Sequence, residues 1–294
     1  MFPSPPGCVS LRPSGRGVER TGSVSDLNEP VLILSDLHLG HPASRIDDVQ
    51  SLRPLIQGAG TVVFNGDTWQ ELAKDFRPRS EQMLAELKAL CADLGAGTIF
   101  LSGNHDPGWP GRGWLELAHG KIIVTHGDAV MWAGSPWSRE AFQLQKTLLD
   151  AWEEHRAAED DAAERLKWAR RVAVMLRAAR YPRGRKLWRR FVDAVNPPRR
   201  AVKIMEAWLY HAWAADSFAQ RYFPESECLI AGHFHSGGCW SFPGRVMINT
   251  GAFVAPHSPG WVELHQGWLR YGRVGKKQEF TRGNVRQVWR FPSQ

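Results

Sequence analysis

The chain has 294 residues, of which 43% are hydrophobic, and its formal charge is +7. This length is enough for a large core in one domain, with or without an insertion. No uncharged apolar run approaches the roughly 18 residues that a membrane span requires. The basic charge favours anionic partners. The four cysteines lack CxxC spacing, so neither a zinc knuckle nor a disulfide framework is indicated, and a cytoplasmic location is expected.

Residues 1–29 are rich in Pro, Ser, Gly and Arg, and we expect a disordered tail there, followed by one domain over residues 30–294. Short apolar runs then alternate with helix-like segments, which is typical of a layered α/β fold. The first four predicted strands are Val31–Ser35, Thr61–Asn65, Thr98–Ser102 and Ile122–Thr125. Apolar residues at helical spacing predict a helix over Ser80–Leu94, with Ser80 as its N-cap and Gly95 as its stop.

From residue 138 to about residue 222 the alternation stops, and apolar residues recur at helical steps. We therefore predict an all-helical insertion over this part of the chain. Strand-like runs return after it, at Cys228–Ala231, Arg245–Asn249 and Trp261–His265.

Five of the predicted strands end in side chains suited to binding a metal. In chain order these side chains are Asp36 with His38, then Asp67, then Asn104 with His105 and Asp106, then His126, and finally His233 with His235. Each of them alone has an ordinary explanation as a turn, a cap or a buried histidine. Because sheets of this kind present their chemistry just past the strand ends, the joint pattern predicts one shared site. Carboxylate, amide and imidazole groups together suit Mn²⁺, Fe or Zn²⁺.

The ordered set of motifs resembles the calcineurin-like metallophosphoesterase family. These motifs are Asp36-x-His38, Gly66-Asp67, Gly103-Asn104-His105-Asp106, His126-Gly127-Asp128 and Gly232-His233-x-His235. The resemblance implies an α/β fold with a two-sheet sandwich flanked by helices. It also implies two divalent metal ions, with Mn first and Fe or Zn as alternatives, that hydrolyse a phosphoester or pyrophosphate through metal-bound hydroxide. By this resemblance Asp36, His38 and His235 hold one ion, Asn104, His126 and His233 hold the other, and Asp67 bridges the two.

His105 has no metal in this assignment, and Asp106 follows it directly. We predict that His105 contacts the phosphoryl group or protonates the leaving oxygen, with Asp106 orienting its ring. The alternative is a loop histidine and its cap. His41, Asp128 and Asn249 are candidates for orienting the ligands, with turn and strand-end roles as the alternative.

Residues 165–203 hold fourteen Lys or Arg and one acid, a local charge of +13 that leaves −6 for the rest of the chain. One interpretation is a solvated helical hairpin whose arginines pair with acids upstream. The other is a lid that rests on an anionic membrane or covers acyl chains. In that case the candidates for binding substrate phosphate are Arg165, Arg170, Arg171 and Arg177.

The insertion and the opening Asp36-Leu37-His38-Leu39-Gly40 also resemble the UDP-2,3-diacylglucosamine hydrolases of lipid A synthesis, which implies a nucleotide-sugar lipid substrate under a helical lid. The chain departs from that branch at His105, where Arg is usual, and at Gln70, where an acid is usual. Two alternatives stay open. One is a soluble phosphodiesterase or phosphatase acting on nucleotides or nucleic acid, and the other is a non-catalytic scaffold of the same fold.

Overall fold

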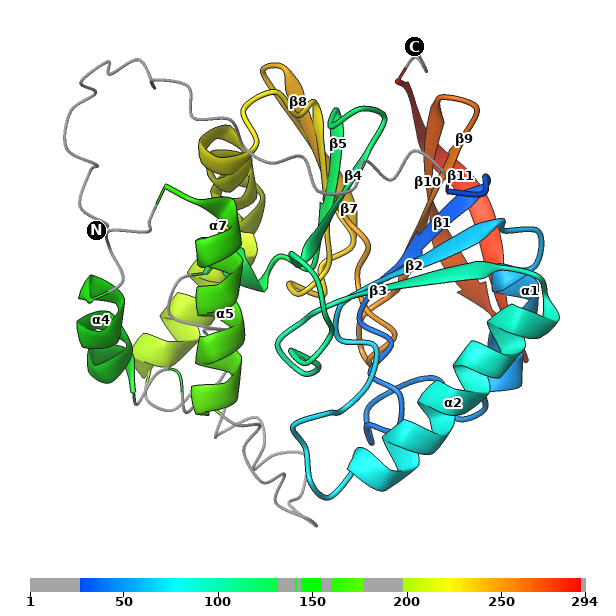
Figure 1. Ribbon diagram of the computed structural model, residues 1–294, viewed down its shortest axis with the longest axis horizontal. Coiled ribbons are helices and arrows are strands. Elements are labelled where there is room, and N and C mark those ends of the chain that lie inside the picture. The colour runs from blue at the N-terminus through cyan, green and yellow to red at the C-terminus, as the bar shows by residue number, and fades with distance from the viewer. Residues whose placement is uncertain (1–26, 132–140, 142–143, 155–159, 177–197, 292–294) are drawn as a thin grey trace.

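The computed structural model describes residues 27–131, 141, 144–154, 160–176 and 198–291. Its strands form two sheets (Figure 1). The six-stranded sheet has the order β11-β10-β9-β1-β2-β3, and the five-stranded sheet has the order β4-β5-β6-β8-β7. The strands are β1 (Val31–Leu34), β2 (Thr61–Asn65), β3 (Gly97–Leu101), β4 (Trp114–Leu117), β5 (Ile122–Thr125), β6 (Cys228–Ala231), β7 (Gly238–Phe242), β8 (Arg245–Asn249), β9 (Gly260–His265), β10 (Trp268–Lys276) and β11 (Phe280–Arg290).

Helices cover the outer face of each sheet (Figure 1). The 3₁₀ turn η1 (Val49–Leu52), α1 (Arg53–Ile56) and α2 (Arg77–Asp93) lie against the six-stranded sheet. The helices α4 (Gln145–Glu153), α5 (Ala162–Leu176) and α7 (Pro198–Tyr222), with the short turn η2 (Asp128–Val130), lie on the side of the other sheet. This arrangement confirms the predicted two-sheet sandwich flanked by helices.

Strand β1 is buried on both of its faces. Leu32 and Leu34 point into the cluster that includes Leu87 of α2. Val31 and Ile33 point the other way, into the cluster between the two sheets. Because successive strand residues face opposite sides, a strand buried on both faces is an unbroken apolar run. This burial explains the short runs by which the strands were predicted.

The parallel strands bring the predicted site residues to one edge of the sandwich. Strands β1, β2 and β3 run parallel to one another, and so do β5, β6 and β8. Their boundaries match the predicted ones at β2, β5, β6 and β8 and differ by one residue at β1 and β3. The carboxyl ends of these strands form the crevice in which a ligand is expected.

Helix α2 corrects one prediction. It begins at Arg77, with Pro78 in its first turn, so Ser80 is not its N-cap. The Ser80 hydroxyl is buried, donates to the Leu39 carbonyl (2.6 Å) and accepts from the Gln70 N–H (2.8 Å). Ser80 therefore joins α2 to the loops after β1 and β2. The helix ends before Gly95, as predicted, where a backbone φ of 68° terminates it.

The described parts of the predicted insertion are helical. Helix α7 lies against β6 and β8 through Ala212, Ala215 and Ala219, which pack on Leu229 and Met247. Among the described helices, none has both the length and the apolar character needed to cross a bilayer.

Candidate metal centre

The loops that carry the predicted ligands have an unusual backbone. Eight non-glycine residues of the described chain have a positive φ, and five of them are predicted ligands. These five are Asp36 (53°), His38 (47°), Asp67 (50°), His233 (63°) and His235 (58°). A left-handed backbone disfavours L-residues, and Asp and His tolerate it better than most. Backbone strain is therefore concentrated where the strands end and the predicted ligands begin.

Two glycines allow the carboxylates of the site to approach the backbone closely. A Cβ on Gly103 would lie 2.4 Å from Asp67 Oδ1, and a Cβ on Gly232 would lie 2.2 Å from Asp36 Oδ2. Real Cβ atoms do not reach such distances, so any side chain at either position would displace a carboxylate.

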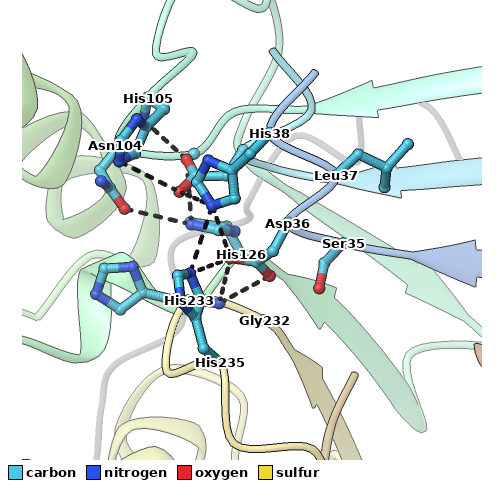
Figure 2. Close-up of polar contacts among 12 residues, drawn as sticks. Ser35, Asp36, Leu37, His38, Asn104, His105, His126, Gly232, His233 and His235 are labelled. Carbon is cyan, nitrogen blue, oxygen red and sulfur yellow. Dashed lines mark hydrogen bonds and ion pairs between the residues drawn. The ribbon is translucent and has the colours of Figure 1, made fainter. Parts of the chain in front are cut away.

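One group of donors forms around His38 (Figure 2). Its Nε2 lies 3.9 Å from Asp36 Oδ1 and 3.4 Å from His235 Nε2. His235 Nε2 is in turn 3.3 Å from Asp36 Oδ1. The donor atoms of these three residues all lie within 4.8 Å of one another, close enough to hold one metal ion.

A second group forms around His126. Its Nε2 lies 3.4 Å from Asp67 Oδ1 and 3.4 Å from Asn104 Oδ1. The other oxygen of Asp67, Oδ2, faces the first group and lies 3.7 Å from His38 Nε2. The ring centroid of His233 lies 5.2 Å from that of His126, and the His233 N–H donates to both oxygens of Asp36. Asp67 thus presents one oxygen to each group.

The hydrogen bonds show that a cation fits between these groups. His126 Nδ1 lies 3.0 Å from the Asn65 carbonyl oxygen, which can only accept, so Nδ1 carries the proton. A neutral His126 therefore presents the lone pair of Nε2 to the oxygens of Asp67 and Asn104. Electron pairs that meet in a buried site need a proton or a metal ion between them. The mixture of carboxylate, amide and imidazole donors suits Mn²⁺, Fe or Zn²⁺.

The pKa values of His38, His233 and Asp67 agree with this arrangement, whereas the pKa of His126 is raised well above its ordinary value because the neighbouring Asp67 carboxylate outweighs the effect of burial. Burial and the neighbouring His105 hold the pKa of His38 well below its ordinary value, and burial and His126 do the same for the pKa of His233. Burial opposes ionisation of Asp67, but His126 and His105 together lower its pKa well below the ordinary value. Neutral imidazoles and an ionised carboxylate are the forms that bind metal ions.

His105 lies at the outer side of the site. Its side chain is 25% exposed, against 4% for His38 and 2% for Asp67. Its Nε2 is 4.0 Å from Asp67 Oδ2, and the ring stands edge-on to His38 at a centroid distance of 4.7 Å. Its donor atom also lies within 4.8 Å of those of His38 and Asp67, so geometry alone makes it a further possible ligand.

The prediction that Asp106 orients the His105 ring is wrong. His105 Nδ1 instead lies 2.9 Å from Gln70 Oε1. The Asp106 carboxylate accepts from the backbone N–H groups of Asp67 (2.8 Å), Thr68 (2.8 Å) and Gly103 (2.9 Å), and from the Trp109 indole (3.1 Å). These donors come from the loops after β2 and β3, so Asp106 joins the two loops. Its oxygens are occupied by them and do not face the His105 ring.

The candidate arginines of the insertion have different surroundings. Arg170 donates from Nε to Ser102 Oγ (3.0 Å) and from Nη2 to the Gly111 carbonyl (2.7 Å), which joins α5 to the loop between β3 and β4 that carries Asn104. Arg165 is buried, with its guanidinium 5.0 Å from the centroid of the Trp152 ring. Arg171 is exposed, and Arg177 lies outside the described residues. Arg170 therefore contacts a loop of the site.

The three candidate orienting residues hold loops. Asn249 donates to the Gly232 carbonyl (2.7 Å) and accepts from the Gly251 N–H (2.8 Å), which fixes the loop that carries His233. Asp128 accepts from the Ala129 N–H (3.0 Å), and burial raises its pKa. His41 Nδ1 accepts from the Ala43 N–H (3.1 Å).

Two neighbours of the site were not predicted to belong to it, although the resemblance had marked Gln70 as a position where an acid is usual. Gln70 contacts both His38 and His105. His257, in the loop after β8, has its ring 5.2 Å from that of His235 and 6.1 Å from that of Trp208 on α7. Both positions depend on contacts between loops that are distant in sequence, which no local pattern records.

Comparison with family models finds one match, and it covers the part of the chain that holds the predicted ligands. Residues 29–236 match the family described as calcineurin-like phosphoesterase. The chain therefore belongs to the calcineurin-like phosphoesterase family. A search of curated proteins finds no match.

Several solved structures are similar to the chain at low sequence identity. A predicted phosphoesterase from Streptococcus pneumoniae is 17% identical, with 89% of this chain and 97% of that one covered and a TM-score of 0.38. A dimetal phosphatase from Danio rerio is 14% identical, with 90% and 100% covered and a TM-score of 0.44. Vacuolar protein sorting 29 from Cryptosporidium parvum is 12% identical, with 90% and 100% covered and a TM-score of 0.42.

Proposed function

We propose that the chain is a phosphoesterase that works with two divalent metal ions and hydrolyses a phosphoester or pyrophosphate bond. The observation that carries this proposal is the placement of Asp67, whose Oδ2 faces His38 and whose Oδ1 faces His126. A carboxylate with one oxygen in each of two donor groups is suited to hold two cations side by side. Mn²⁺ is the expected ion, and Fe and Zn²⁺ accept the same donors.

Two divalent ions bound there would supply Lewis acidity, which lowers the pKa of water and neutralises charge on a phosphoryl oxygen. The protein supplies position and a donor. The buried carboxylates Asp36 and Asp67 are fixed by backbone N–H groups, from His233 to Asp36 and from His105 to Asp67. His105, the more exposed imidazole, can reach a bound phosphoryl group or its leaving oxygen.

Metal content and hydrolysis measured together test this proposal. The protein is loaded with Mn²⁺, its metal is counted by elemental analysis, and its turnover of bis-p-nitrophenyl phosphate is measured. We expect two ions per chain in the wild type and fewer, with turnover lowered at least about 10²-fold, in Asp67→Asn, because one ligand of each ion is weakened. Asp93→Asn is the matched control, since the Asp93 side chain is 62% exposed and pairs with Arg53 on the surface. Full metal content and full turnover in Asp67→Asn would overturn the proposal.

We further propose that the substrate is a phosphorylated amphiphile, of which UDP-2,3-diacylglucosamine is one example. Ten of the thirteen exposed large hydrophobic residues of the described chain lie on α4, α5 and α7 or at their ends. Six of them are on α7 alone. These six are Val202 (48%), Met205 (58%), Trp208 (48%), Leu209 (66%), Tyr210 (58%) and Trp213 (64%).

The apolar surface of α7 leads to the metal centre. Trp208 contacts His257, and His257 contacts His235 at the site. Val202, Met205, Leu209 and Trp213 recur at steps of three and four, so they form one stripe along the helix. A phosphate at the metal centre with an apolar chain along this stripe would use both surfaces at once. Lys203, next to the stripe, and the basic residues before it would favour an anionic lipid surface.

Changes on the stripe separate an amphiphilic substrate from a soluble one. In Leu209→Ser/Trp213→Ser we expect unchanged turnover of the soluble diester. On a nucleotide-sugar lipid we expect kcat/KM to fall about 10–100-fold, because about 1.5–3 kcal/mol of apolar burial in the transition state is lost. Val288→Ser on β11, where Val288 is 47% exposed, is the control. Flotation with anionic vesicles is measured in parallel with binding to oligonucleotides. Binding to oligonucleotides alone, with equal loss on both substrates, would favour a nucleic-acid-directed phosphodiesterase instead.

A further inference from the structure

The side-chain amide of Gln70 lies between two imidazoles of the site. Gln70 Nε2 is 2.9 Å from His38 Nδ1, and Gln70 Oε1 is 2.9 Å from His105 Nδ1. Gln70 is buried, and its own N–H donates to the Ser80 hydroxyl (2.8 Å). The next residue, Glu71, donates its N–H to the His105 carbonyl (3.1 Å). The amide is therefore held in place between the two rings.

An amide has one end that donates and one end that accepts. The imidazole nitrogen that faces the amide NH₂ must offer a lone pair. The imidazole nitrogen that faces the amide oxygen must carry a proton. We propose that Gln70 is a positioning residue that imposes opposite tautomers on His38 and His105. A half-turn about its Cγ–Cδ bond exchanges the two ends and reverses both tautomers together.

The surroundings of His38 decide which tautomer pair serves a metal ion. Its Nε2 faces Asp36, Asp67 and His235 at 3.4 to 3.9 Å, whereas His105 Nε2 lies 4.0 Å from Asp67. His38 Nε2 must then keep its lone pair for the ion, so His38 Nδ1 carries the proton and donates to the amide oxygen. The amide nitrogen consequently donates to His105 Nδ1. His105 is left with its proton on Nε2.

This step rests on the proposed function and sharpens it. His105 and His38 cannot both be neutral ligands through Nε2, because one amide oxygen accepts from only one of the two Nδ1–H groups. His105 is instead a hydrogen-bond donor aimed at the phosphoryl group. A carboxylate at position 70 would accept from both rings and would leave neutral His105 with no proton on Nε2. The glutamine therefore couples ligation by His38 to donation by His105.

Nitrogen NMR of the whole protein tests the tautomers directly. The chain has 11 histidines, and ¹⁵N-labelled imidazoles distinguish a protonated from an unprotonated ring nitrogen. The signals of the two residues are assigned from spectra of His38→Gln and His105→Gln. Without metal, we expect one ring to carry its proton on Nδ1 and the other on Nε2. The same tautomer in both rings would overturn the inference whether or not the protein is an enzyme.

Zn²⁺, which is diamagnetic, is then added. We expect Zn²⁺ at Nε2 of His38, a proton on its Nδ1, and a proton on Nε2 of His105. Zn²⁺ at His38 with the His105 proton on Nδ1 would overturn the inference while leaving the metal site intact. If no histidine signal responds to Zn²⁺, the proposed function fails, and the metal-free spectrum still decides the pairing by Gln70.

Two variants of Gln70 separate a role in setting the tautomers from a role in folding alone, because they should change the ring protonation or the Zn²⁺ affinity in different ways. In Gln70→Glu both Nδ1 atoms should carry protons, and Zn²⁺ affinity should stay within about tenfold because His38 keeps an acceptor. In Gln70→Leu affinity should fall about 10–100-fold. Gln82→Glu, at an exposed glutamine of α2, is the matched control and should leave the spectrum unchanged. An unprotonated His105 Nδ1 in Gln70→Glu would count against the inference.

Discussion

Replacing Asp106 by asparagine should loosen the two loops that carry Asp67 and Asn104. The carboxylate of Asp106 accepts from Asp67 N and Gly103 N at Oδ1, and from Thr68 N and the Trp109 indole at Oδ2. Asparagine replaces one of these oxygens with an NH₂ group, which cannot accept. With the NH₂ group at the Oδ1 position two N–H donors face another donor, and at the Oδ2 position the Trp69 N–H (3.4 Å) adds a third.

The contacts give the size of the effect. A buried donor without a partner costs about 1–3 kcal/mol, so two of them reduce the free energy of unfolding by about 2–6 kcal/mol. At about 2 °C per kcal/mol for a domain of this size, Tm should fall by about 4–12 °C. Metal affinity should fall as well, because Asp67 and Asn104 would no longer be held at fixed positions.

Urea unfolding and elemental analysis of Asp106→Asn check both expectations. The control is Asp93→Asn, an exposed partner of Arg53, for which we expect less than about 1 kcal/mol. If the variant unfolds at the wild-type urea concentration and loses activity only, Asp106 acts on the chemistry and not on the loops. That result would refute the reasoning.

Three further changes follow from other contacts. Gly103→Ala places a Cβ 2.4 Å from Asp67 Oδ1, and turnover should fall at least about 10²-fold because the carboxylate must move. Arg170→Met removes the bonds to Ser102 and Gly111, and a urea titration should show a loss of about 1–3 kcal/mol. His211 donates from Nδ1 to a helix carbonyl, and burial lowers its pKa. The neutral form of His211 therefore contributes to the free energy of unfolding fully above pH 6.5, and this contribution is lost as the pH falls below 6.5. In His211→Phe the free energy of unfolding should fall less over the same pH range.

Each of these changes has its own control. Gly97→Ala should be harmless to turnover, since the nearest atom to its Cβ is 3.6 Å away, and equal losses in both alanine variants would point to general destabilisation. Arg171→Met at an exposed site should leave stability within about 0.5 kcal/mol. A raised KM with unchanged stability in Arg170→Met would mean that this arginine binds substrate. Equal pH dependence of the wild type and His211→Phe would exclude the buried histidine as the source.

The sequence predicts the inner strands well, because a strand buried on both faces is a short apolar run. Val31–Leu34 and Thr61–Asn65 are of this kind. The hairpin of β10 and β11 was not predicted, since β11 is largely exposed and rich in arginine. This segment forms a strand because it pairs with β10, and the local sequence pattern of β11 does not indicate this pairing.

The candidate site divides in the same way. Asp36 and Asp67 were predicted because each follows a strand end that the sequence marks. The partner of His105 was not, because Gln70 reaches it only when the loops after β2 and β3 pack together. The resemblance marked Gln70 as a departure from an acid but did not name its partner, and Asp106, which directly follows His105, was the obvious but incorrect choice.

The left-handed backbone at five predicted ligands also bears on how the protein can change in evolution. Each such residue disfavours the folded chain by about 1 kcal/mol, and five together approach the lower end of the net stability of an ordinary domain. Glycine would relieve that strain at any of them and would remove a donor at the same step. Selection for stability alone would therefore erode this centre, because each glycine that relieves the strain also removes a donor.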